Sequence, residues 1–481
     1  MSFQDPPTLL ELLRQRLLKD ESLAISGLQD LPRELFPTLF MEAFTGRQFK
    51  ILKAMVAFWP FPCLPVGALM KNPHLETLQA VLDGLDMLFT QKGHPRKWKL
   101  QVVDLRNVHH NFWNMWAGKK DGRCSPQVLN KKQIGKDLPR YALRRHLKVV
   151  VDFSYWFHLD AYQTYILQWA EQRKNSLQLC CKKMEICTLP ICTIRKILKI
   201  LQAEYIEKLE LNLGWSVSTL ACFSPHLGQM RNIHTLSLAR IYKNTLKMDH
   251  TFTDSEEKCI NKFILQFSKL NCLQHLHMSD IYFLADHMKQ LLRYLKVPLE
   301  TLSISHCQLT QLDVSSLSQC QSLSLLKHLT LRGVELSDLC LMNLRVLLES
   351  VANTLQILEL DHCKMEDSQL TVLLPAISQC SQLTKVNFYE NDISMAVLKD
   401  LLYHTASLSQ LTLELYPAPL ECYNDMGGFL PERFSQLCPE LMDTLRSIRK
   451  PVVVSFATDI CLDCFERSVY NLQTRLCLCW Q

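Results

Sequence analysis

Four cysteines near the end of the chain are the residues best suited to do chemistry. They form two close pairs, Cys461-x2-Cys464 and Cys477-x-Cys479, separated by twelve residues. Four thiolates in two pairs around a short loop can hold a zinc ion tetrahedrally, as structural zinc sites do. However, C-x-C is a tighter pair than the usual C-x2-C, and no glycine helps the chain to turn. The sequence therefore leaves two interpretations open: a structural zinc site, or four free, partly buried thiols.

The rest of the composition argues against an enzyme and against a dedicated nucleic-acid binder. Glycine is scarce, at 13 of 481 residues, and neither GxxxxGK[ST] nor GxGxxG occurs. No HExxH, GxSxG or kinase-like set is found either. The net charge of +6 comes from 53 basic and 47 acidic residues, a small excess on a mixed surface. We expect no catalytic residue, no cofactor apart from the zinc just considered, and no direct contact with nucleic acid.

The sequence shows neither a secretion signal nor an uninterrupted membrane span. Its first residues, MSFQDPPTLLELLRQ, lack a basic stretch followed by an apolar one. We therefore expect the 20 cysteines to stay reduced, in a protein of the cytoplasm and also of the nucleus. The most apolar run, residues 51–70, is interrupted by Lys53 and by prolines at 60, 62 and 65. It predicts a buried helix followed by irregular backbone, and no transmembrane helix.

A repeat runs through the second half of the chain and must position any functional side chains there. Three segments, LETLSISHCQL (299–309), LQILELDHCKM (355–365) and LTKVNFYENDI (383–393), fit the leucine-rich pattern L-x-x-L-x-L-x-x-N/C-x-L. Looser copies begin at 206, 233, 273, 326 and 408. Successive copies start 25 to 29 residues apart, except for one step of 40 residues that contains a polar insertion. Degenerate copies begin earlier, near residue 100.

Each part of the pattern has a physical reason. In L-x-L the leucines point inward from a short strand and the x residues point outward. The N/C side chain, such as Cys307 or Cys363, then bonds turn backbone that no ladder satisfies, and a helix returns on the outside. The pattern predicts an α/β leucine-rich-repeat solenoid, a horseshoe with parallel strands on its concave face and helices on its convex face. We expect an N-terminal helical region at 1–96, repeats at 97–430 and a C-terminal cap at 431–481.

The outward strand positions are the candidate binding surface of such a solenoid. Their charges are mixed in sign, which suits a protein partner better than a phosphate backbone. Nine of them are the candidate partner-binding residues: His275, His277, His328, Arg332, Glu359, Asp361, Lys385, Tyr389 and Glu414.

Two amphipathic helices are predicted before the repeats. Thr8 and Glu11 form a capping box that opens a helix with a broad leucine face. The second segment, DLPRELFPTLFMEAF, places Pro32 in a helix's first turn, with Leu31 and Leu35 as apolar anchors. These helices could be the N-terminal cap of the solenoid or a docking element laid into another protein's groove. Their spacing leaves both possibilities open.

Several long segments resemble the PRAME (preferentially expressed antigen in melanoma) family. They are LLKDESLAISGLQDLPRELFPTLFMEAF, WPFPCLPVGALM, RKWKLQVVDL, LCCKKMEI, PLETLSISHCQL, LLPAISQCSQLT and LYPAPLE, spread over nearly the whole chain. The resemblance implies a substrate receptor of a cullin-2 RING ubiquitin ligase, joined through elongins B and C. It also implies negative regulation of transcription, apoptosis and differentiation, and positive regulation of proliferation. The alternative function is a protein-binding co-repressor or scaffold without ligase contact.

The resemblance also assigns docking residues. The elongin box falls on Thr8, Leu9, Leu13 and Leu17, although Leu13 stands where a small cysteine or alanine is preferred. That larger side chain could overfill the elongin pocket, at a cost of about 1–3 kcal/mol. The cullin box falls on Leu31, Pro32 and Leu35, and the same LPRELFPTLF also resembles the start of an F-box, which would bind Skp1 instead. A monomeric solenoid would then hold an unknown protein substrate within the complex, and no residue would do chemistry.

Overall fold

The computed structural model describes residues 9–70, 74–90, 99–116, 147–155, 158–243 and 253–480. Thr8 of the predicted elongin box lies outside the described residues. Contacts divide the chain into two compact units, Met1–Met184 with Cys192–Ile206, and Glu185–Ile191 with Glu207–Gln481. This division by contacts does not test the predicted boundaries at 96/97 and 430/431, which stay predictions.

The first unit begins with helices and continues as strands alternating with helices. Its helices are α1 (Leu9–Lys19), α2 (Glu21–Gly27), α3 (Phe36–Thr45), α4 (Phe49–Ala57), α5 (Leu75–Thr90), α6 (His110–Trp116), α8 (Ala161–Glu171) and α9 (Ile191–Ile200). Its strands are β1 (Cys63–Leu64), β2 (Val102–Asp104), β3 (Leu147–Tyr155) and β4 (Leu177–Cys187), which lie side by side in chain order. The pairs β1–β2 and β2–β3 are parallel.

An aromatic cluster holds the irregular segment after α4 in the first unit. The ring of Phe40 lies 5.2 Å from that of Trp59 and 5.7 Å from that of Trp113. Both indoles also donate hydrogen bonds to this segment, Trp59 to the Cys63 carbonyl at 2.9 Å and Trp113 to the Pro65 carbonyl at 2.7 Å. Residues 51–70 are therefore a buried helix followed by irregular backbone, as predicted. Among the described residues, no helix is both long and apolar enough to cross a membrane.

The second unit repeats a strand and a helix. Its strands are β5 (Lys208–Ser216), β6 (Thr235–Tyr242), β7 (His275–Ile281), β8 (Thr301–Ser305), β9 (His328–Thr330), β10 (Ile357–Glu359), β11 (Lys385–Asn387), β12 (Leu413–Pro417), β13 (Val453–Ala457), β14 (Val469–Tyr470) and β15 (Thr474–Arg475). Its helices are α10 (Val217–Leu227), α11 (Asp254–Ile264), α12 (Met288–Arg293), α13 (Gln311–Ser318), α14 (Met342–Ser350), α15 (Asp367–Ile377), α16 (Met395–His404) and α17 (Pro431–Ile448). Strands β5 to β13 pair in parallel, and β14 and β15 follow in antiparallel pairs.

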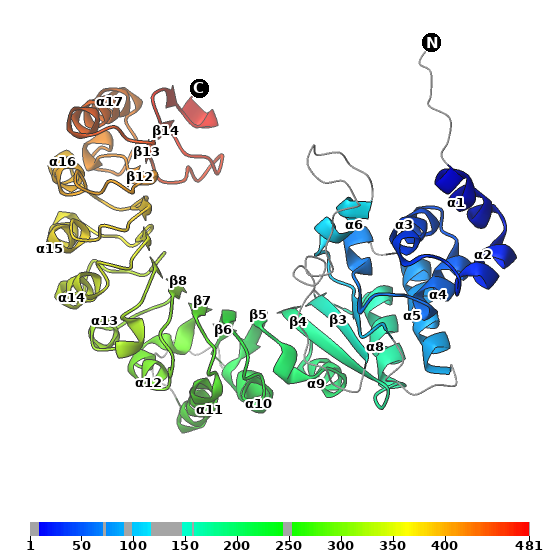
Figure 1. The fold of residues 1–481 in the computed structure, drawn as a ribbon. Coiled ribbons are helices and arrows are strands. Elements are labelled where there is room, and N and C mark those ends of the chain that lie inside the picture. The colour runs from blue at the N-terminus through cyan, green and yellow to red at the C-terminus, as the bar shows by residue number, and fades with distance from the viewer. Residues whose placement is uncertain are drawn as a thin grey trace, which may run out of the picture. The chain divides into compact units, whose positions relative to one another are not determined.

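The leucines of the repeat form the core of this unit. Leu302, Leu329, Leu358 and Val386 are paired in register on four neighbouring strands, and all are 0% exposed. The strands line the inner side of this unit and the helices its outer side (Figure 1). The leucine-rich-repeat fold predicted from the sequence is confirmed, with its parallel strands on one face and its helices on the other.

The side chain at the N/C position of the repeat bonds the backbone of the preceding rung, as we call one strand and its helix. Asn391 donates to the Leu360 carbonyl at 2.8 Å and accepts from the Met365 amide at 3.0 Å. In the same place of other rungs, the Cys363 thiol donates to the Leu331 carbonyl at 2.8 Å and Cys307 accepts from the Ile281 amide at 3.4 Å. Burial raises the pKa of Cys307 to about 11 and that of Cys363 to about 12. These cysteines are therefore neutral packing and turn residues, as their position in the motif predicts.

The structure at β12 corrects the predicted start of that copy of the repeat. In the sequence this copy starts at Leu408, which would point Glu414 outward. The structure instead pairs Glu414 with the inward Val386, and the carboxylate is 0% exposed. The copy therefore starts at Leu411, 28 residues after Leu383, and Glu414 takes the place of an inward leucine.

A buried tyrosine and a half-buried arginine compensate the inward glutamate. The Arg449 guanidinium donates to one Glu414 oxygen at 2.8 Å and also contacts the second. The Tyr416 hydroxyl donates to Glu414 at 2.7 Å. Glu414 was predicted as a partner-binding residue of the concave face. That position is wrong, because the Glu414 side chain is buried and bonds Arg449 at the end of helix α17.

This arrangement predicts a strongly non-additive pair of substitutions. Glu414→Leu restores the leucine of the motif but leaves Arg449 unpaired in a nearly buried place, so the free energy of unfolding should fall by about 3–5 kcal/mol. Adding Arg449→Met removes the stranded charge, and most of that loss should be recovered. Urea denaturation of the four chains of the cycle measures both effects. Additive losses would mean that Glu414 and Arg449 do not form a buried pair.

Candidate functional site

The inner strands of the second unit present one continuous row of outward side chains. Alternation along each strand buries the repeat leucines and leaves most of their neighbours partly exposed on this face, with Thr301 and Asp361 buried at 7% exposure. The strand-lined face, as we call it, carries eight of the nine predicted partner-binding residues: His275, His277, His328, Arg332, Glu359, Asp361, Lys385 and Tyr389. The structure does not test their role in binding, which stays a prediction.

Three neighbouring strands bring imidazoles together on this face. His275 and His328 lie on either side of Thr301, and their Nδ1 atoms are 2.9 Å and 3.3 Å from its hydroxyl. Burial, and next the nearby His275, lower the pKa of both His277 and His328. These two rings are therefore uncharged at neutral pH and offer a partner hydrogen-bond donors and acceptors rather than positive charge.

Next to the histidines, charges of both signs are already paired. Arg332 contacts Asp361 at 2.6 Å, and Lys385 contacts Glu359 at 2.6 Å. Burial raises the pKa of Glu359, but hydrogen bonds from Lys385 and Thr330 outweigh it, so the net pKa is lowered and the carboxylate stays ionised. Two cations and two anions on adjacent rungs give a patch without net charge. Such a patch suits the mixed surface of a protein better than a polyanion.

The C-terminal segment adds a residue to this face that the repeat pattern could not reveal. The guanidinium of Arg467 lies 5.2 Å from the centre of the Tyr389 ring and forms an ion pair with Glu390. Glu390 is also paired with His362. Arg467 lies beyond the last repeat and therefore has no motif position; only the return of the chain onto the rungs brings it here.

The first unit displays several of the predicted docking residues. Leu9 and Leu13 on α1 are 86% and 43% exposed, whereas Leu17, one turn further, is buried at 8%. Pro32 is exposed, and Leu31 and Leu35 on either side of it are half-buried. Leu17 is therefore a core residue, and the leucine surface left uncovered is the first half of α1.

Sequence reasoning missed two more exposed leucines in this region. Leu12 on α1 and Leu23 on α2 are 47% and 43% exposed. Exposed leucines that gather on one helix side mark interaction sites more often than ordinary surface. We call Leu9, Leu12 and Leu13, which share helix α1, the leucine patch. The spacing of Leu9, Leu12 and Leu13 on one helix could have indicated it, because such spacing places residues on one side.

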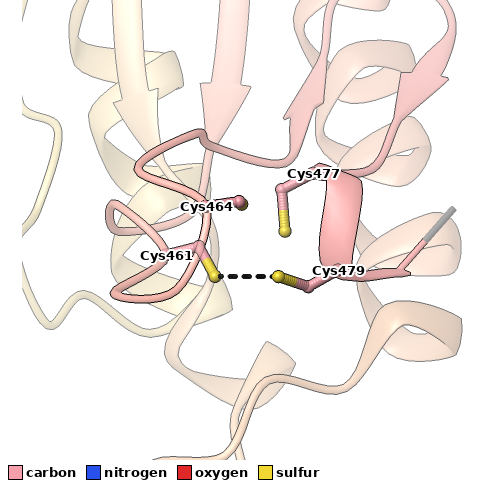
Figure 2. A group of neighbouring side chains, drawn as sticks. All are labelled: Cys461, Cys464, Cys477 and Cys479. Atoms are coloured by element: carbon pink, nitrogen blue, oxygen red, sulfur yellow. Dashed lines mark hydrogen bonds between the residues drawn. The ribbon is translucent and has the colours of Figure 1, made fainter.

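The C-terminal cysteines converge, as one of their two interpretations required. Figure 2 shows the side chains of Cys461, Cys464, Cys477 and Cys479 turned toward one another. All four sulfur atoms lie within 4.8 Å of one another, and those of Cys461 and Cys479 are 3.7 Å apart. The amide of Glu466 lowers the pKa of Cys464 to about 7. Within the described parts of the chain, this is the one group of three or more possible ligand residues close enough to share a metal ion.

Comparison with known proteins finds matches to one protein family in both units of the chain. The model of the PRAME N-terminal domain matches residues 6–113, and that of the PRAME C-terminal domain matches residues 147–479. PRAME family member 12 of Homo sapiens is 46% identical over 99% of this chain and 98% of its own length. PRAME family member 8 of Homo sapiens is 45% identical over the full length of both, and Oogenesin-3 of Mus musculus is 43% identical over 99% and 94%. A solved internalin of Listeria monocytogenes aligns over 56% of this chain and 80% of its own, at 14% identity and a TM-score of 0.29, too weak a likeness to carry an argument. By its two domains and by relatives that match it from end to end, this chain belongs to the PRAME family.

Proposed function

We propose that this chain is the non-enzymatic substrate-recognition subunit of a cullin-2 RING ubiquitin ligase. In this proposal the leucine patch docks on elongin C, and the segment around Pro32 contacts cullin-2. The strand-lined face holds the substrate protein, which is then ubiquitinated for degradation by the proteasome. The complex would act in the cytoplasm and the nucleus, with this chain as a monomer beside elongins B and C and the RING subunit.

The observation that carries the proposal is the exposed leucine patch. Leu9, at 86% exposure, leaves most of an apolar side chain in water, and Leu12 and Leu13 extend the same surface. Exposing such side chains costs about 1.5–3 kcal/mol each relative to full burial, which docking into an apolar groove recovers. A helix with anchors at this spacing fits the helix-in-groove mode of recognition. The same surface argues against a purely internal cap, because a cap would bury these leucines.

The mechanism needs no reacting group on this chain. A receptor that holds its substrate on one surface and the ligase on another raises the local concentration of substrate lysines near the transferred ubiquitin. The paired charges and neutral imidazoles of the strand-lined face provide orientation by hydrogen bonds and by matched charge. The strand-lined face would then select the substrate whose surface charges complement its own. A role as a transcriptional co-repressor without ligase contact would use the same face but not the leucine patch.

The docking half of the proposal can be tested at the leucine patch. Leu9→Asp with Leu13→Asp places two charges where an apolar groove must close, so recovery of elongin C and cullin-2 with the chain should fall about tenfold or more. The matched control is Leu312→Asp, which changes a 72% exposed leucine on helix α13. Quantitative mass spectrometry of purified complexes gives the readout, and thermal melting confirms that all variants stay folded.

Three results of this experiment are informative. Unchanged recovery of elongin C in the double variant contradicts docking at the leucine patch. Recovery of Skp1 in place of elongin C from wild type would assign the ligase to the F-box class. Wild-type chain that recovers none of these subunits supports the co-repressor alternative and rejects the ligase proposal.

The substrate half predicts a separate loss at the strand-lined face. Arg332→Gln with Lys385→Gln leaves Glu359 and Asp361 without cations, so a neutral patch becomes a doubly negative one. Proteins that accumulate with the chain when the proteasome is blocked should fall about fivefold or more, whereas elongin C and cullin-2 should be retained. Lys364→Gln with Lys399→Gln, which removes the same charge from pairs with Glu335 and Glu440, is the control. Equal losses in both double variants would mean that substrate does not bind at this face.

A further inference from the structure

The last segment of the chain is ordered without a hydrophobic core of its own. Between residues 459 and 480, Ser468 and Cys477 are the buried side chains, and every other residue is half-buried or exposed. Large apolar groups there face outward: Leu462 is 87% and Phe465 79% exposed. Short segments that bury so little apolar area usually need a disulfide or a metal to hold one conformation.

The two strands in this segment are too short to supply the missing stability. β14 and β15 have two residues each and form a hairpin, which on its own is marginal in water. The first cysteine pair precedes this hairpin and the second follows it, so its open ends bring the four thiols together (Figure 2). A ligand shared by the two pairs would therefore close the hairpin at its base.

The distances between the sulfur atoms fit tetrahedral coordination of one metal ion. With zinc–sulfur bonds of about 2.3 Å, neighbouring sulfurs of a tetrahedral site lie about 3.8 Å apart. Cys461 and Cys479 are 3.7 Å apart at sulfur, and no pair of the four exceeds 4.8 Å. A disulfide needs about 2.05 Å between its sulfur atoms, and each of the four cysteines is a free thiol here.

The backbone of both cysteine pairs is fixed by hydrogen bonds. At the first pair, the Phe465 amide donates to the Cys461 carbonyl and the Cys461 amide donates to the Glu466 carbonyl, each at 2.9 Å. At the second pair, the Cys477 amide donates to the Ser468 hydroxyl at 3.1 Å. The first two bonds close a sharp turn, in which Phe465 has a φ of +58°. A bulky residue rarely adopts this left-handed conformation, which persists where the surrounding structure requires it.

We propose that Cys461, Cys464, Cys477 and Cys479 together bind one structural Zn²⁺ ion. Binding would release the four thiol protons to solvent and leave four thiolates around the metal, without any change of oxidation state. Zinc is the metal that suits four sulfur ligands in a closed tetrahedral site. This proposal is independent of the ligase function proposed above.

The proposed zinc has a role that follows from the sheet topology. β14 pairs with the free edge of β13, the last parallel strand, and so ends the row of rungs. An uncovered edge strand can pair with strands of other chains and cause aggregation, so solenoids need their ends capped. The same segment carries Arg467 to Tyr389 on the strand-lined face. Zinc would therefore hold both the cap and one end of that face.

Metal analysis of the intact chain tests the proposal directly. Full-length protein expressed with zinc in the medium and purified under reducing conditions should contain roughly one zinc per chain. Cys464→Ser should reduce that content about tenfold, whereas Cys340→Ser, which changes an exposed cysteine outside the cluster, should leave it unchanged. After removal of zinc, added Co²⁺ should give the intense sulfur-to-metal charge-transfer and tetrahedral d–d bands of thiolate ligation.

A second readout keeps the test valid if Cys464→Ser folds poorly. In wild type, trypsin should cleave after Arg467 and Arg475 at least about fivefold faster once a chelator has removed the metal, and zinc should restore protection. Less than about a tenth of a zinc per wild-type chain would overturn the proposal, given the affinity expected of a four-cysteine site. So would a Cys461–Cys479 disulfide as the species that protects the segment in the metal-free protein, or a zinc content that does not depend on these cysteines.

Discussion

Burial of one stripe of leucines between strands and helices is the constraint on which the second unit depends. A single strand and helix cannot cover their own apolar faces, so each rung is stable only when stacked in register on the next. Register is strongly specified here, because a slip of one residue would turn every leucine outward. The backbone that leaves each strand must also be satisfied, and Asn391, Cys363 and Cys307 do this by bonding the preceding rung. The rung at β12 shows how far the constraint reaches: when Glu414 takes a leucine's place, Arg449 and Tyr416 donate hydrogen bonds to its buried carboxylate.

The same constraint explains why the candidate binding surface is so regular. Inward positions are reserved for packing, so variation is free only at the alternate positions that face outward. There the side chains come from neighbouring rungs at the spacing of paired strands, which brings His275, Thr301 and His328 into hydrogen-bond reach although they are distant in sequence. Charges on this surface neutralise each other in pairs. Recognition by such a surface depends on the geometry of many modest contacts rather than on one strong site.

The first helices of the chain and its last segment both carry unusual features. The N-terminal helices leave Leu9, Leu12 and Leu13 in water, which is the basis of the proposed docking site. The C-terminal segment pairs with the last strand but buries almost no apolar side chain, which is the basis of the proposed zinc site. Both proposals supply cover for unsatisfied surface, an external protein partner at the first helices and an internal metal at the last segment.

The sequence by itself determined the repeat, its inward and outward positions, the turn role of Cys307 and Cys363, and the pairing of the four C-terminal cysteines as possible ligands. All of these depend on local spacing, which a strand or helix of known period converts directly into position. The sequence did not determine the frame at 411, because a glutamate at a leucine position hides the motif, and partners from elsewhere in the chain make that glutamate acceptable. It also did not determine that Leu17 is buried while Leu9 is exposed, or that Arg467 returns to Tyr389. Only tertiary structure decided these points, because each depends on which distant segment covers a side chain.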